Sequence, residues 1–178
     1  DTDMIIPKQF LKTIKRTGLG KSLFYEMRYD ESGELIEDFI LNNKPYSNSK
    51  ILIAGKNFGC GSSREHAVWA IYDKGFRVVV SSFFADIFKN NCLNIGVLPI
   101  QVTDSFLLEI FSRIEKDPDS VFEVNLENQE FIIAESGKKE KFKISVYKKS
   151  NMSNGFDDID YLLNKKKEIS KFANKSRY

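Results

Sequence analysis

Short apolar runs alternate with amphipathic stretches through the middle of the chain. The runs are rich in β-branched residues, as strands buried in parallel sheets are, and they cover residues 51–54, 76–80 and 97–100. The amphipathic stretches have the apolar spacing of helices, and they cover residues 62–74, 83–93 and 104–116. This order of strands and helices predicts a parallel α/β core over residues 50–116 with right-handed crossovers.

The pattern changes after the predicted core. Over residues 117–150 apolar and polar positions alternate, with turn signals at residues 128–129 and 136–137, which predicts a β-meander. We expect the strands of the meander at residues 121–126, 131–133 and 142–146. A C-terminal helix and tail should follow over residues 151–178, with a polar helix at residues 156–173.

The N-terminal part, residues 1–49, is irregular. Its stretch at residues 12–21 is basic and contains two glycines, which is typical of a mobile surface loop. With the core and the meander, these segments predict a single α/β domain over residues 1–178. Because the sequence begins with Asp1, we expect the natural N-terminus to lie upstream.

Composition and charge exclude several classes of protein. With 178 residues, of which 42% are hydrophobic and 29% charged, the chain can bury an ordinary core, so disorder is excluded. Its 27 basic and 25 acidic residues leave a net charge of +2, which gives no reason to expect a nucleic-acid partner. No apolar stretch approaches the roughly 20 residues that span a bilayer, and no signal peptide opens the chain, so we expect no membrane association and a cytoplasmic location.

Candidate metal ligands are scarce. Cys60, Cys92 and His66 are the only cysteine and histidine side chains. Three such ligands are one short of a closed tetrahedral zinc or cubane iron–sulfur site. Chemistry that needs such a centre would therefore take it from a partner.

Residues 55–66 connect the first predicted strand to its helix, at the place where open α/β sheets bind ligands. Ser62 and Glu65 have the spacing of a capping box, which leaves other first-turn amides free beside the positive end of the helix dipole. Gly59 and Gly61 let the backbone approach a ligand, and Arg64 offers a fork for a carboxylate. The segment therefore predicts an anion site.

The spacing alone does not fix the anion. The segment is neither a phosphate loop nor a dinucleotide fingerprint, so we favour a carboxylate over a phosphate. Ser62 and Ser63 are either helix caps or catalytic residues, and the spacing does not decide between the two.

The motif at residues 57–67, Asn-Phe-Gly-Cys-Gly-Ser-Ser-Arg-Glu-His-Ala, resembles the signature of the small subunits of 3-isopropylmalate dehydratase, in the aconitase superfamily. The resemblance extends to residues 1–7, 10–13, 84–91, 94, 96, 98–100 and 154–159. It departs from the family in two places: the N-terminal strand usual before Asp1 is missing, and the Lys-rich tail after Leu163 matches nothing in particular.

The resemblance implies a fold, an activity and a partner. The fold is a swivelling β/β/α domain, and the activity is the isomerisation of 2-isopropylmalate and 3-isopropylmalate by dehydration and rehydration in leucine biosynthesis. In this family a [4Fe–4S] cluster on a large subunit acts as the Lewis acid. The chain is therefore expected to bind no cofactor itself and to act with that large subunit on a small dicarboxylate.

The resemblance also implies roles for the signature residues. Ser62 would be the alkoxide base, Ser63 a hydrogen-bond donor to substrate, and Arg64 the clamp on a substrate carboxylate, with Gly61 also in the substrate site. A serine hydroxyl is a weak acid, so backbone amides and the positive helix end must stabilise the alkoxide. Cys60 either approaches the cluster or fills a tight turn, and we favour the turn.

The loop that includes Leu11, Lys12 and Thr13 resembles the segment with which the family distinguishes substrates. Leu11 is expected near the isopropyl group, whereas Lys12 would suit a substrate with an additional carboxylate. His66 is expected to be a packing or interface residue. Asp1, Thr2 and Asp3 are expected to help shape the site.

Two alternatives to isopropylmalate isomerisation stay open. One is a hydro-lyase small subunit for a related acid, such as methylmalate or homoaconitate, because an apolar pocket discriminates weakly between related chains. The other is a module that binds carboxylates or RNA without catalysis, against which the near-neutral charge argues.

Overall fold

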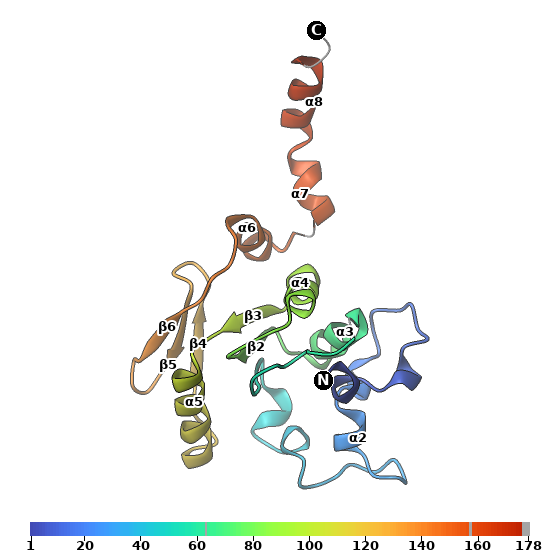
Figure 1. The fold of residues 1–178 in the computed structure, drawn as a ribbon, viewed down its shortest axis with the longest axis vertical. Helices are drawn as coiled ribbons and strands as arrows, with labels where there is room; N and C mark the ends of the chain where they lie inside the picture. Colours follow the sequence, from blue (N-terminus) through green and yellow to red (C-terminus); the bar gives the residue numbers. More distant parts are fainter. Residues whose placement is uncertain (63, 157, 176–178) are drawn as a thin grey trace. The chain divides into compact units, whose positions relative to one another are not determined.

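The computed structural model describes residues 1–62, 64–156 and 158–175 (Figure 1). The chain divides into two units, Asp1–Lys143 and Ile144–Tyr178, and each is described by itself. The expectation of a single domain stays a prediction. No helix in the described ranges is long and apolar enough to cross a membrane.

Three parallel strands form the centre of the first unit. They are β1 (Ile51–Ile53), β2 (Val78–Ser81) and β3 (Leu98–Gln101), in the order β1-β2-β3. Leu52 pairs with Val79, which pairs in turn with Pro99. Val79, Val80 and Ile100 are fully buried, as the apolar runs require. The parallel α/β core is therefore confirmed.

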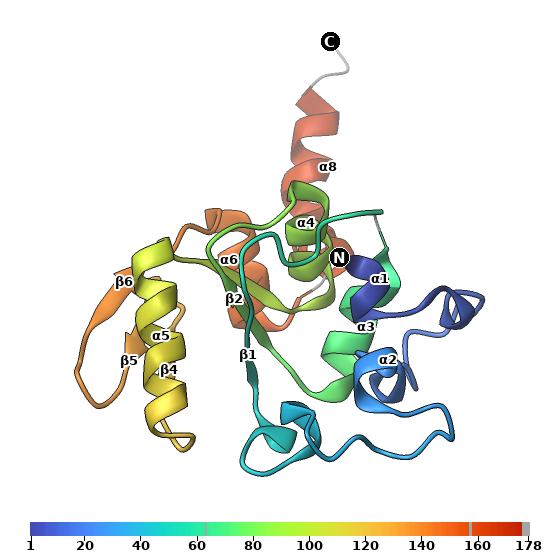
Figure 2. The ribbon, with the colours of Figure 1, turned by 60° about the horizontal axis from the view of Figure 1, so that its bottom comes forward.

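Three helices follow these strands: α3 (Glu65–Lys74), α4 (Asp86–Ile95) and α5 (Asp104–Lys116). α3 and α4 lie side by side next to the sheet (Figures 1 and 2). The bounds of α5 agree with the sequence prediction, because the Thr103 hydroxyl accepts a hydrogen bond from the Phe106 N–H and fixes the start.

The first two helices begin three residues later than predicted. Arg64 is the N-cap of α3 and makes no side-chain cap bond, so the capping box from Ser62 to Glu65 was wrong. The chain before Arg64 turns through positive φ angles at Gly59 and Gly61, which delays the helix. α4 starts late because Phe84 forms a parallel bridge with Phe58, which keeps this stretch extended.

The antiparallel sheet consists of β4 (Phe122–Asn125), β5 (Glu130–Ile133) and β6 (Lys139–Lys141), in that order. The meander and its first two strands are confirmed, but the third strand was misplaced at residues 142–146. The third strand consists of charged residues, so it carries no apolar strand pattern in the sequence. Lysines commonly occupy edge strands of this kind. Phe142, which suggested the strand, is buried just beyond it.

α5 lies beside this meander in both views (Figures 1 and 2). The Glu140 carboxylate accepts hydrogen bonds from the Thr103 N–H at 2.6 Å and from its hydroxyl at 2.8 Å. An ion pair joins Arg113 of α5 to Glu135 at 2.6 Å. The start of α5 is thus tied to the third strand of the sheet.

The N-terminal part, which the sequence predicted to be irregular, contains short helices. They are α1 (Thr2–Ile5), η1 (Lys8–Phe10), η2 (Gly20–Ser22), α2 (Tyr25–Arg28), η3 (Ile40–Asn42) and η4 (Tyr46–Asn48). Ile5, Ile6 and Leu23 are fully buried here, and they belong to the same hydrophobic core as Val68 and Ile71 of α3. This segment is therefore part of the core, which its irregular pattern did not predict.

Over residues 144–156 and 158–175 the second unit contains three helices: α6 (Val146–Asn154), α7 (Asp158–Asn164) and α8 (Lys166–Lys175). The sequence predicted one helix over residues 156–173. It missed α6, whose start is capped by the Ser145 hydroxyl, which accepts a hydrogen bond from the Lys148 N–H. In place of the one predicted helix the structure has α7 and α8, which are separated at Lys165.

Candidate active site

Aromatic side chains hold the segment that leaves β1. The Phe58 ring meets the Phe88 ring edge-on at 5.6 Å, and Phe84 stacks on Phe88 at 6.1 Å. Gly59 is buried with φ +76°, and a Cβ atom there would overlap the Phe88 ring. We predicted that Gly59 lets the backbone approach a ligand, but in the structure it makes room for Phe88. The sequence analysis missed this aromatic contact because Phe88 lies 29 positions further along the chain.

The start of the chain brackets the end of this segment. The Thr2 N–H donates to the Cys60 carbonyl oxygen at 2.9 Å, and the Thr2 hydroxyl donates to the Ser62 carbonyl oxygen at 2.9 Å. A Cβ atom on Gly61 would lie 2.5 Å from Asp1 Oδ1. Gly61 and Ser62 are themselves exposed. The structure therefore presents the predicted base at the surface on a backbone that buried Thr2 fixes.

Arg64 lies at the N-terminus of α3, directly after this turn. Its side chain is only 12% exposed, and its Nη1 atom forms an ion pair with Asp3 Oδ1. A guanidinium has five N–H donors, so this one recorded pair leaves donor capacity for a second carboxylate. The expectation that Asp3 helps shape the site agrees with this geometry.

The predicted substrate loop meets α3 one turn further on. His66 Nε2 lies 2.8 Å from the Thr13 carbonyl oxygen, and the His66 ring lies 4.5 Å from that of Trp69. This agrees with the packing role expected for His66. Leu11 is half-buried and packs against the hydrophobic core, whereas Lys12 is exposed. Of Leu11, Lys12 and Thr13, Thr13 is the residue whose backbone contacts α3.

Ser63 lies outside the described residues, so its predicted role stays a prediction. Of the other predicted site residues, the structure brings Gly61, Ser62 and Arg64 together at the start of α3. Arg16 and Trp69, which also join the loop to α3, were missed in the sequence. The apolar spacing of α3 marks Trp69 only as a core position.

The cysteines do not fit an iron–sulfur cluster. Cys60 is half-buried in the turn before α3, where its N–H donates to the Asn57 carbonyl oxygen at 3.2 Å. Cys92 is fully buried in α4, and this burial raises the pKa of its thiol. Within the described ranges no three His, Cys, Asp or Glu side chains gather closely enough to hold a metal ion.

Comparison with known proteins gives one family. The model of the aconitase C-terminal domain matches residues 1–105. The 3-isopropylmalate dehydratase small subunit of Azobacteroides pseudotrichonymphae is 52% identical over 178 residues, which is all of this chain and 90% of that protein. The protein of the same name from Christiangramia forsetii is 54% identical over 177 residues, 99% of this chain and 86% of that protein.

A solved structure agrees with these relatives. The crystal structure of 3-isopropylmalate dehydratase from Methanocaldococcus jannaschii superimposes with a TM-score of 0.66 and 30% identity, covering 96% of this chain and 90% of that one. The α/β fold class and the resemblance read from the motif are confirmed. The tail was wrongly taken to match nothing, since the Azobacteroides protein aligns with the full chain. The chain belongs to the family of 3-isopropylmalate dehydratase small subunits.

Proposed function

We propose that the start of α3 supplies the base and the carboxylate clamp for the interconversion of 2-isopropylmalate and 3-isopropylmalate. Membership of the small-subunit family of this hydro-lyase supports the reaction. The observation that carries the assignment of residues is the Arg64–Asp3 ion pair beside the exposed Ser62. Arg64 already holds the Asp3 carboxylate in a nearly buried position, and a guanidinium has five N–H donors. It is therefore suited to hold the carboxylate of a malate as well.

Ser62 acts as the base in this proposal. Dehydration of a 2-hydroxy or 3-hydroxy acid removes a carbon-bound proton, and a serine oxygen accepts that proton only if its anion is stabilised. Arg64, the N-cap of α3, makes no side-chain cap bond among the residues the structure describes, so the positive end of the helix dipole is available to an anion. Ser62 precedes the N-cap by two residues, within reach of that field.

The chain needs a partner for the other half of the reaction. Hydroxide is a poor leaving group, and the [4Fe–4S] cluster of a large subunit would supply the Lewis acid that binds the substrate hydroxyl. The two thiols of this chain do not fit such a cluster, as their separate positions in a turn and inside α4 indicate. Two unpaired cysteines also suit the reducing cytoplasm that we propose as the location.

Reconstitution tests the proposal. The chain is mixed anaerobically with its large subunit, and turnover of 2-isopropylmalate is measured for the pair and for each protein alone. We expect activity from the pair only, and a loss of kcat of about a hundredfold or more for Ser62→Ala. Ser170→Ala, on the exposed face of α8, serves as the control. Full activity of Ser62→Ala would remove Ser62 as the base.

A related acid is the second candidate, because Lys12 is exposed on the predicted substrate loop. A cation there suits a substrate with an additional carboxylate, such as homoaconitate. The same pair is therefore assayed with isopropylmalate, methylmalate and homoaconitate. A higher kcat/KM for homoaconitate would replace the first assignment.

A further inference from the structure

The loop between Thr13 and Gly20 runs beside α3 in constant register. The Thr13 carbonyl oxygen contacts His66, the Arg16 guanidinium lies over Trp69, and the Gly20 N–H donates to Asp73 Oδ2 at 2.7 Å. The partners in each of these three contacts are 53 positions apart in the sequence. Residues 66, 69 and 73 share one face of a helix, since each is three or four positions from the next.

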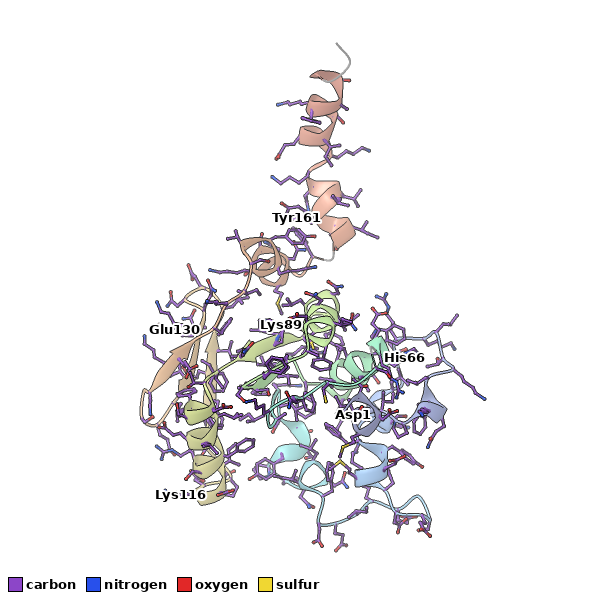
Figure 3. The ribbon with its side chains drawn as sticks, viewed as in Figure 1. Asp1, His66, Lys89, Lys116, Glu130 and Tyr161 are labelled. Atoms are coloured by element: carbon purple, nitrogen blue, oxygen red, sulfur yellow. The ribbon has the colours of Figure 1, made fainter. Side chains whose placement is uncertain are left out.

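The first contact is a hydrogen bond supported by ring packing. A carbonyl oxygen only accepts, so His66 Nε2 donates its proton to Thr13 O across 2.8 Å. Thr13 also accepts, through its side-chain oxygen, a hydrogen bond from the Lys15 N–H at 3.1 Å, which closes the turn of the loop. Figure 3 shows His66 on the side of α3 that faces the N-terminal segment.

The second contact uses the only tryptophan of the chain. The Arg16 guanidinium carbon lies 5.6 Å from the centre of the Trp69 ring, within the range of a cation–π interaction. The indole N–H is buried without a hydrogen-bond partner in the described part of the chain. Trp69 is therefore held by packing, including its contacts with His66 and Arg16.

The third contact fixes the far end of the loop. Gly20 is buried, and a Cβ atom there would lie 2.7 Å from the backbone nitrogen of Lys74. The loop backbone thus lies directly against the last turn of α3. Between Thr13 and Gly20, residues 14–18 are exposed, Ile14 at 92%, whereas Leu19 is buried in the hydrophobic core. The three contacts with α3 therefore hold the exposed part of the loop.

We infer that His66 is a positioning residue that sets the substrate loop relative to Arg64 and so determines discrimination between substrate side chains. This inference rests on the proposed function and on the expectation that the loop with Leu11, Lys12 and Thr13 distinguishes substrates. His66 follows the carboxylate clamp by two residues, about 3 Å of helix rise. A rigid link from Thr13 to α3 therefore fixes the distance between the clamp and the loop that surrounds the alkyl group.

Hydrogen exchange of the full-length chain tests the link without any assay of activity. His66→Ala should accelerate exchange of the amides in residues 12–17 by about fivefold, the factor that corresponds to one hydrogen bond. His66→Gln, whose amide donates to the same carbonyl, should restore most of the protection. Lys15→Ala, at an exposed position of the loop, is the matched control. Unchanged exchange in His66→Ala would overturn the inference.

Substrate selectivity tests the consequence. In the reconstituted pair, His66→Ala should lower the ratio of kcat/KM for 2-isopropylmalate to that for 2-methylmalate by about fivefold. Most of this change should come from KM for 2-isopropylmalate, and the double variant with Arg16→Ala should lose less than the product of the single effects. Equal losses with both substrates would assign His66 a merely structural role.

The two outcomes separate the inference from the proposed function. If the wild-type pair turns over no alkylmalate while His66→Ala accelerates loop exchange, the proposed function fails and the link to α3 stands. If the pair is active and His66→Ala changes neither exchange nor selectivity, the inference fails alone.

Discussion

The hydroxyl of Thr2 donates a hydrogen bond to the carbonyl oxygen of Ser62, 60 positions away in the chain. The N–H of the same residue donates to Cys60, so one side chain and its backbone hold both sides of Gly61. Thr2 is only 1% exposed. The position of the proposed base is therefore set by the start of the chain as well as by α3.

Thr2→Val keeps the shape of the side chain and removes this hydrogen bond. We expect the free energy of unfolding to fall by about 1 kcal/mol, and kcat of the reconstituted pair to fall more than KM rises, because Ser62 loses its support. Denaturant unfolding and steady-state kinetics measure the two effects. Thr17→Val, in the exposed part of the substrate loop, is the control. Wild-type values for both would show that the bond has no positioning role.

Gly59→Ala places a methyl group against the ring of Phe88 at a backbone angle that alanine rarely adopts. We expect a loss of about 2–4 kcal/mol in the free energy of unfolding, the sum of overpacking and left-handed strain. Gly33→Ala separates the two terms, since Gly33 has φ +86° and no atom within 4 Å of the added Cβ. It should lose only about 1 kcal/mol. Equal losses would mean that Phe88 moves aside without cost.

Arg64→Lys keeps the charge of the clamp and loses its fork. We expect KM for isopropylmalate to rise by about tenfold, the worth of one charge-assisted hydrogen bond, with a smaller loss of kcat. Arg77→Lys is the control, because Arg77 bonds to the carbonyl oxygens of Tyr72 and Phe76. Any effect there should appear in stability rather than in KM. Unchanged kinetics for Arg64→Lys would remove Arg64 from the substrate site.

Local signals predicted much of the fold. α5 has a capping threonine before it and Asp117-Pro118 after it, and its bounds follow directly from these residues. β6 carried no such signal, because this edge strand consists of three charged residues. α3 carried a misleading one, since the spacing of Ser62 and Glu65 fits a capping box that the turn at Gly61 prevents from forming.

From the residues alone the site was predictable only where it is continuous in the sequence, and the expectation for Thr2 and Asp3 came from the family resemblance. Residues 61, 62 and 64 form one motif, and the structure keeps them together. The partners of that motif come from further away: Thr2 and Asp3 from the start of the chain, and Arg16 through Trp69. Such pairs are fixed by how the N-terminal helices pack on α3, and periodicity within one segment carries no information about it.

Cys92 predicts how stability changes with pH. Burial raises the pKa of its thiol above the ordinary value of 9.0, so above pH 9 the unfolded chain releases this proton while the folded chain retains it. Stability should therefore be lost as pH rises, by up to about 1.4 kcal/mol per pH unit for this group. Cys92→Ala lacks this proton and keeps every other titratable group, so the stability difference between wild type and variant should shrink by about 2 kcal/mol between pH 7.5 and 10.5. Urea unfolding under reducing conditions measures this difference, and a constant value would mean that the folded chain ionises Cys92 as readily as the unfolded one.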